Sequence, residues 1–119
     1  MATPFRLTPR PIRVTAITKQ NLQDSLDVSA YDEIDALCAI DAIASGTGLA
    51  IKLITGMQKE TEDGWVTLLS WTAGNLDTLG DCECINASTR VLKFIRWEVT
   101  GVGGAASITF DISGMLRRR

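Results

Sequence analysis

The sequence predicts a single all-β domain, an antiparallel β-sandwich of about eight strands of the jelly-roll or Greek-key type with an extended N-terminal arm. Short runs of alternating apolar and polar residues recur through the second half of the chain, which is typical of strands with one buried face. Turn residues such as Asp63-Gly64 and the glycine-rich segment 101–104 separate these runs. The 119 residues suffice for one domain with a sizeable core.

Residues 1–11 contain all three prolines of the chain. Proline lacks a backbone N–H, so this segment is predicted to be neither a helix nor a central strand, but an extended arm. A detached arm would expose Phe5 and Leu7, so we expect it to lie on its own sandwich or on a neighbouring subunit. The expected organisation is an arm at 1–11, a sandwich at 12–116 and a basic tail at 117–119.

The alternation and the turn residues divide the rest of the chain into eight expected strands. These are 12–17, a weak extended segment at 26–28, 34–43, 49–54, 65–72, 82–86, 91–100 and 107–113. A turn is expected at 45–48, and the glycines of 101–104 are typical of a hairpin connection rather than a phosphate-binding loop, because no helix follows them. The cleanest alternation is that of 107–113, with Ile108, Phe110 and Ile112 predicted to face inward.

The segment 34–43 is the most ambiguous of these, because its alanines and leucine also favour a helix. As a strand it places Ile34, Cys38 and Ala42 on one face. We predict a strand, since turns bound the segment and every later segment is β-like.

Charge is concentrated at the two ends of the chain. Six arginines lie there with no acidic residue among them: Arg6, Arg10, Arg13, Arg117, Arg118 and Arg119. Removing those six from the twelve basic residues leaves six against fourteen acidic ones, so the body carries about −8 out of a total of −2. An acidic body repels nucleic acid, whereas the basic ends can reach an acidic neighbour or simply solubilise the chain. No direct nucleic-acid contact is expected.

The three cysteines, Cys38, Cys82 and Cys84, are predicted to be buried free thiols. The spacing of Cys82 and Cys84 places both on one strand face, which is poor geometry for a disulfide between them. A zinc site is not expected, because the chain has no histidine.

The sequence predicts no enzyme and no cofactor. Without histidine, a Ser-His-Asp or Cys-His arrangement cannot be built from one chain. Acidic residues crowd 24–35, but their spacing fits no EF-hand loop, and we interpret them as a solvated surface. The N-terminus lacks the apolar core of a secretory signal, and no run approaches the ~20 apolar residues of a membrane span.

The tryptophans Trp65, Trp71 and Trp97 are predicted to pack in the core or at an interface, rather than to form an exposed platform for sugars. Arg96 and Glu98 lie within the strand that carries Trp97. A charge inside a sandwich strand must reach solvent or find a partner, so we expect intersubunit contacts at these two residues.

Three segments carry a resemblance to a known class of proteins. They are Thr55-Gly56-Met57-Gln58 with Glu62-Asp63-Gly64-Trp65-Val66-Thr67-Leu68, then Leu92 through Phe94-Ile95-Arg96-Trp97-Glu98-Val99, and Ile108-Thr109-Phe110-Asp111-Ile112-Ser113-Gly114. This pattern of strand and turn residues resembles that of small β-sandwich structural proteins of tailed bacteriophages, over roughly residues 25–116. It includes no catalytic fingerprint.

The resemblance implies a virion structural protein, most specifically a capsid decoration or cement protein that stabilises the shell by binding across neighbouring capsid subunits. The implied partners are the major capsid protein or other virion subunits and further copies of the chain, with a trimer expected because decoration proteins often sit on threefold axes. Assembly in a host cytoplasm and residence in the virion follow, with no membrane. The alternatives are another virion component, in the neck, tail or fibre, and a carbohydrate-binding module.

In this hypothesis the arm and the basic ends bind the partner. The residues concerned are Phe5, Arg6, Leu7, Arg10, Arg13, Arg117, Arg118 and Arg119. Deletion of residues 1–11 is expected to leave a folded sandwich that no longer binds its assembly.

Overall fold

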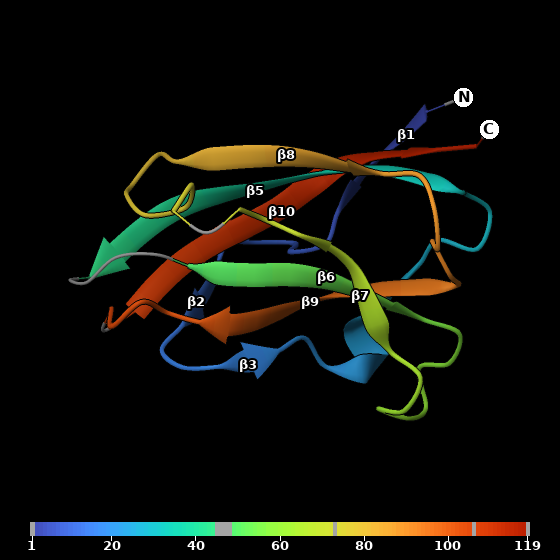
Figure 1. The fold of residues 1–119 in the computed structure, drawn as a ribbon, viewed down its shortest axis with the longest axis horizontal. Coiled ribbons are helices and arrows are strands. Elements are labelled where there is room, and N and C mark those ends of the chain that lie inside the picture. The colour runs from blue at the N-terminus through green and yellow to red at the C-terminus, as the bar shows by residue number, and fades with distance from the viewer. Residues whose placement is uncertain (1, 45–48, 73, 106, 119) are drawn as a thin grey trace.

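Two antiparallel sheets pack face to face in the computed structural model, which describes residues 2–44, 49–72, 74–105 and 107–118 (Figure 1). The expected all-β sandwich is therefore confirmed. The turn expected at 45–48 lies outside the described residues. Among the described residues, no helix is long and apolar enough to span a membrane.

The described residues form ten strands and one 3₁₀ turn, η1. Their bounds are β1 (Ala2–Arg6), β2 (Ile12–Val14), β3 (Thr18–Lys19), η1 (Leu22–Asp24), β4 (Leu26–Asp27), β5 (Glu33–Ala44), β6 (Ala50–Gly56), β7 (Val66–Ser70), β8 (Cys82–Ala87), β9 (Phe94–Gly101) and β10 (Ser107–Arg117). All eight expected strands are present, and two further short ones, β1 and β3, were not predicted.

The strand order is that of a jelly roll. One sheet runs β1-β10-β5-β8, with β2 also pairing β10, and the other runs β3-β9-β6-β7, with β4 also pairing β9. If β1 and β2 count as one edge strand and β3 and β4 as another, the first strand pairs with the last, the second with the seventh, the third with the sixth and the fourth with the fifth. A long antiparallel hairpin that rolls up into two sheets has this order.

The core fills the space between the sheets, and the inward faces are those that the alternation predicts. In β10, Ile108, Phe110 and Ile112 are fully buried. Trp97 of β9 meets Phe110 edge to face, with ring centroids 5.2 Å apart, so an aromatic pair joins the two sheets.

The ambiguous segment 34–43 is a strand, β5, and the helix alternative is wrong. Ile34 and Cys38 are buried as the alternation predicts, but Ala42 is exposed. The register between β5 and β10 shifts between Thr109 and Phe110, which leaves Asp41 without a direct partner in the ladder. Such a bulge moves the following residues to the opposite face, which explains the error at Ala42.

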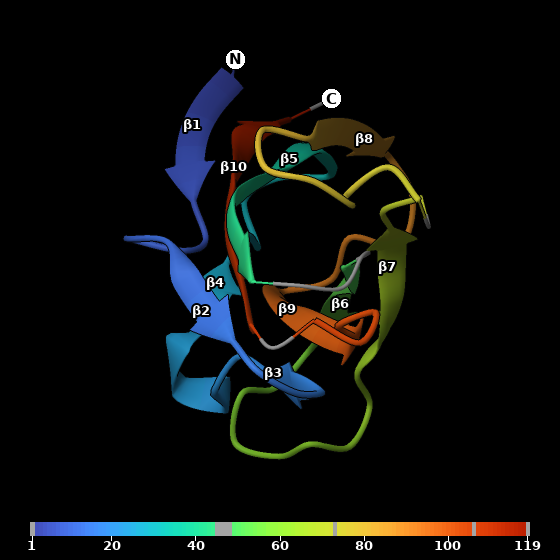
Figure 2. The ribbon, with the colours of Figure 1, turned by 90° about the vertical axis from the view of Figure 1, so that its left-hand side faces the viewer.

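The N-terminal segment packs on the chain's own sandwich. Residues 2–6 form β1, which pairs with the end of β10 at the edge of its sheet, and both termini therefore lie at one end of the molecule (Figures 1 and 2). Phe5 and Leu7 are buried in the core. An edge strand accommodates Pro4 because it need not donate hydrogen bonds on both sides.

The glycine-rich connection at 101–104 does not close a hairpin. Val102-Gly103-Gly104-Ala105 is a tight turn, with Ala105 N donating to Val102 O at 2.9 Å and both glycines at positive φ. However, β9 and β10 on either side of it belong to opposite sheets. The turn residues were identified correctly, but their connection crosses the sandwich.

Candidate binding groove at the N-terminal edge

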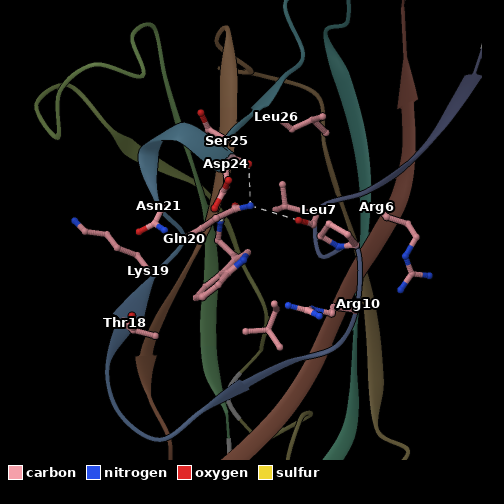
Figure 3. A pocket seen from close by; sticks show the side chains of 13 residues that line it. Arg6, Leu7, Arg10, Thr18, Lys19, Gln20, Asn21, Asp24, Ser25 and Leu26 are labelled. Carbon is pink, nitrogen blue, oxygen red and sulfur yellow. Dashed lines mark hydrogen bonds between the residues drawn. The ribbon is translucent and has the colours of Figure 1, made fainter.

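A groove of about 870 Å³ lies between the segment that follows β1 and the segment that runs from β3 through η1 to β4 (Figure 3). Its lining combines cations, short polar side chains and an apolar floor. The lining residues are Arg6, Leu7, Pro9, Arg10, Ile12, Thr18, Lys19, Gln20, Asn21, Asp24, Ser25, Leu26 and Trp97. Three of the residues that the sequence assigned to partner binding, Arg6, Leu7 and Arg10, therefore line it.

Gln20 holds the two walls of the groove together. Its buried side-chain amide donates to the carbonyl oxygens of Leu7, at 3.4 Å, and Asp24, at 2.9 Å (Figure 3). Its side-chain oxygen accepts a hydrogen bond from the backbone N–H of Trp97 at 3.2 Å. A buried amide that is satisfied on both ends fixes the geometry of the elements it joins, so the groove is preformed.

The electrostatic character of the groove is cationic. Arg6, Arg10 and Lys19 are all exposed at its margin, and Asp24 is the one acidic residue in its lining. A neighbouring hollow of about 660 Å³ shares Lys19 and Asp24 with it and adds Glu62. The excess of cations in the main groove favours an anionic partner.

Arg96 finds its partners within the chain, although its side chain is only 1% exposed. Its guanidinium donates to Gln20 O through Nε, at 2.8 Å, and through Nη2, and to the Glu62 carboxylate at 2.9 Å. Trp65 stacks on the guanidinium, with its ring centroid 5.0 Å from Cζ. The burial of this charge therefore requires no second subunit.

Glu98, the other residue expected at an intersubunit contact, forms an ion pair with Lys52 on the adjacent strand at 3.6 Å. Both side chains are partly exposed, so this pair is accessible to solvent. The structure thus gives Glu98, like Arg96, a partner in its own chain.

Hydrogen bonds from Arg96 and Lys19 hold the pKa of Glu62 below its usual range. Lys19 Nζ lies 3.2 Å from the Glu62 carboxylate. Glu62 therefore stays negative and connects a buried cation to a surface cation beside the groove.

The remaining predicted binding residues are dispersed. Phe5 faces the core, and Leu7, although it lines the groove, is only 3% exposed, so the fold presents little of either side chain to a partner. Arg13 is exposed on β2, outside the groove lining.

The C-terminal arginines are bound to the body rather than forming a tail. Arg117 ends β10 and is paired with Asp35, and Arg118 donates to Ala30 O at 3.0 Å. Arg119 lies outside the described residues.

The three tryptophans do not share a face. Trp71 is buried and its indole N–H donates to the carbonyl oxygens of Ala36, at 3.3 Å, and Glu83, at 3.0 Å. Trp97 is buried beside Phe110, and Trp65 covers Arg96. The prediction of packing over a sugar-binding platform is therefore confirmed for Trp71 and Trp97.

The prediction of buried thiols is correct for Cys38 and wrong for Cys82 and Cys84, which are exposed on β8. Their spacing does place them on one face, but it is the solvent face of the sheet. In the described part of the chain, no group of three or more candidate ligands is placed to hold a metal ion.

The residues that build the groove, Lys19, Gln20 and Asp24, were not predicted as binding residues. They lie in a polar stretch without periodicity, where a local pattern gives no sign of burial. The one available signal was Trp97. It lies in an apolar strand, so another segment of the chain must pack against its ring and bind its backbone N–H. Chemically, the assembled groove provides cations, hydrogen-bonding groups and an apolar floor, a combination suited to an anionic segment.

A scan against protein-family models finds no match, and neither does a search of curated protein sequences. Among solved structures, the chain is similar to the crystal structure of the SPBc2 prophage-derived protein YomS. The TM-score is 0.52 and the identity 20%, and the match covers 97% of this chain and 93% of that one. The likeness therefore extends over nearly the whole of both chains, and what it shows is a shared fold.

Proposed function

We propose that this chain is a structural protein of a bacteriophage virion, and specifically a capsid decoration protein that stabilises the shell by binding across neighbouring capsid subunits. The observation that carries the proposal is the end-to-end similarity in fold to a prophage-derived protein. The strand and turn pattern that resembles small virion sandwiches supports it independently.

The attachment surface in this proposal is the rigid N-terminal edge rather than a detachable arm. Arg6 and Arg10 stand at the groove margin, and Arg13 lies on β2 of the same edge. Because the side chain of Phe5 in β1 is buried in the core, this edge is ordered before it meets a partner. A preformed surface avoids the ordering cost of about 1–2 kcal/mol per residue that a free arm would incur on binding.

The partner that this surface fits is an acidic segment of a shell subunit. Between residues 6 and 19 the chain has four basic residues and no acidic one. Such a cationic edge attracts carboxylates and orients the sandwich on the shell, and its contribution weakens as salt screens it. A sandwich attached across two subunits adds contacts that local opening of the shell must break.

The test is co-sedimentation with particles assembled from the major capsid protein of the same phage. We expect saturable binding at a fixed copy ratio, and a loss of affinity of at least about tenfold in the variant Arg6→Glu/Arg10→Glu. The matched control is Lys59→Glu/Lys93→Glu, which makes the same change in net charge on loop residues that lie over the Phe94 ring, outside the groove lining. It should bind like the unmodified chain.

Equal weakening by both variants would show that net charge alone acts and would contradict a role for the groove. Failure to sediment with shells, combined with binding to neck, tail or fibre proteins of the same phage, would replace decoration by one of those virion roles.

A further inference from the structure

The four lateral edges of the two sheets are not equally protected against pairing with another chain. In the part of the chain that the structure describes, β1 carries Pro4, the β3 and β4 edge consists of two-residue strands, and β7 contains a register shift against β6. Prolines, very short strands and bulges are three of the features by which proteins prevent another chain from pairing with an edge strand. β8 has none of them, because its six residues pair with β5 in regular register.

The backbone of β8 directs hydrogen-bonding groups toward this open edge. Ile40 N donates to Asp81 O at 2.8 Å, and Ile40 O accepts from Gly80 N at 3.0 Å, so Ile40 directs both of its backbone groups toward the segment that enters β8. Since these directions alternate along a ladder, Cys38 also faces β8, and its partner Glu83 faces β5. It follows that Cys82, Cys84 and Asn86 direct their backbone groups to the free side.

The outward-facing side chains of β8 carry no charge, and its one charged side chain, Glu83, is hydrogen-bonded within the chain, to Thr72 N and Oγ1 at 2.7 Å and to Asn75 at 3.2 Å. Cys82, Cys84 and Asn86 are uncharged and exposed on the outer face. Asn86 donates to Glu33, at 2.8 Å, and to Asp35, at 2.7 Å, so the nearest outward carboxylates are already hydrogen-bonded within the chain.

We propose that β8 pairs with β8 of a second copy of this chain, antiparallel about a twofold axis through Cys84. In this register Cys84 lies opposite Cys84 of the other copy, and Cys82 lies opposite Asn86. The two copies exchange backbone hydrogen bonds at these positions, and the sheets that contain β8 join into one continuous sheet. The interface is isologous, so each bond occurs twice.

Charge complementarity favours a second copy in this orientation. The residues just before β8 include Asp77 and Asp81, and the exposed base Arg90 lies just after it. Antiparallel pairing brings the end of each strand to the beginning of the other, so Arg90 of one copy meets the acidic turn of its partner at both ends of the seam. A parallel arrangement would instead place like charges together.

An exposed apolar residue lies at the same position. Leu79, which is 67% exposed, is a central residue of the Thr78–Asp81 turn that leads into β8. Antiparallel pairing of the two β8 strands brings this turn close to the end of the other copy's β8, where contact removes Leu79 from water. This inference does not depend on the proposed virion role.

The first test is sedimentation velocity of the full-length chain under reducing conditions over a range of concentrations, with Cys84→Ser and Cys84→Pro variants. We expect a reversible dimer for the unmodified chain and for Cys84→Ser. Proline at 84 removes an N–H that faces the free edge and spares the ladder with β5, so it should weaken the dimer by at least about tenfold. Unchanged thermal unfolding of the proline variant checks that the fold survives.

The second test is the register. Air oxidation with copper phenanthroline joins two sulfurs, with loss of two protons and two electrons to oxygen, only where the thiols are adjacent. Cys82→Ser, which retains Cys84, should form a disulfide-linked dimer, because directly opposed Cα atoms lie about 5.5 Å apart. Cys84→Ser should not, since the two Cys82 residues are about 13 Å apart in this register.

The third test is a charge exchange. Arg90→Glu alone should weaken the dimer, and Arg90→Glu combined with Asp77→Arg should restore it. A chain that remains monomeric at all concentrations, a dimer that tolerates Cys84→Pro, or cross-linking through Cys82 instead of Cys84 would each overturn the proposal.

Discussion

Among single residues, Arg96 is the clearest case of a charge that suggests an intersubunit contact in the sequence but is bound by partners inside the fold. Its strand position is central and its side chain is buried. Three different kinds of contact compensate for the lost hydration: a backbone carbonyl, a carboxylate and an aromatic face. The stacking of Trp65 also requires Gly56, since a Cβ there would lie 2.8 Å from the ring. None of these partners is adjacent to Arg96 in sequence.

Replacement of Arg96 by methionine is expected to lower the free energy of unfolding by about 2–3 kcal/mol, because Gln20 O loses a charged donor and Trp65 loses its stacking partner. The comparison is Glu62→Gln, which should cost much less, since Glu62 is half exposed and can be hydrated. Urea unfolding of both variants measures the difference. Equal costs would mean that the ion pair, and not the carbonyl and the ring, accounts for the contribution of Arg96.

At the scale of elements, the N-terminal segment is the clearest difference between expectation and structure. Its prolines correctly exclude a helix and a central strand, but an edge strand satisfies the same restriction. Thr8 shows how closely the segment is integrated, because its buried hydroxyl accepts a hydrogen bond from Ile112 N at 2.9 Å. The segment is therefore part of the sandwich.

Deletion of residues 1–11 is now expected to destabilise the sandwich, in contrast to the expectation from sequence. The deletion uncovers the core beneath Phe5 and Leu7, and each large apolar side chain contributes about 2–3 kcal/mol when fully buried. In the full-length chain, Leu7→Ala should cost about 3 kcal/mol by the same reasoning, whereas Pro4→Ala, at an exposed position, should cost little. Thermal and urea unfolding measure all three, and a truncated chain as stable as the full one would show that β1 is dispensable.

For the whole molecule, the pH dependence of stability is set by two groups of carboxylates: those whose pKa is lowered in the folded state and one whose pKa is raised. Hydrogen bonds from Ser29 lower the pKa of Asp27, and backbone N–H groups of Asp77 and Thr78 lower that of Asp81. Glu62 behaves in the same way. Burial, with a hydrogen bond and repulsion from Asp41, raises the pKa of Asp111.

These shifts predict a stability maximum in mildly acidic solution. Groups with lowered pKa values stabilise the fold above their unfolded pKa, and that contribution is lost as pH falls through their folded values. Asp111 acts in the opposite sense, because the folded state retains its proton longer, so stability decreases as pH rises from about 4, near its unfolded pKa, through its folded value.

Asp111→Asn should therefore raise the melting temperature at pH 7 and flatten the decline above pH 4, as measured by thermal unfolding across pH. Asp41→Asn should act in the same direction, since the repulsion is mutual. Glu60→Gln, an exposed residue on the loop between β6 and β7, serves as the control. A decline that persists in Asp111→Asn would locate its source elsewhere.

The strands and most of their faces could be predicted from the amino-acid sequence. Alternation identified Ile108, Phe110 and Ile112 as inward, and the turn at Gly64 is borne out by its positive φ of 82°. These features follow from local chemistry, because burial on one side of a strand imposes a period of two on the nearby residues.

By contrast, three features depend on contacts between distant segments: which strands share a sheet, where β1 lies and what Arg96 binds. The turn at 102–105 has the same residues whether its strands pair or cross the sandwich, and Arg96 meets Gln20 across 76 positions of sequence. The groove and the open edge of β8 both arise from such pairings. A local pattern records how deeply a side chain is buried but not which distant segment buries it, so these features appear only when the sheets are assembled.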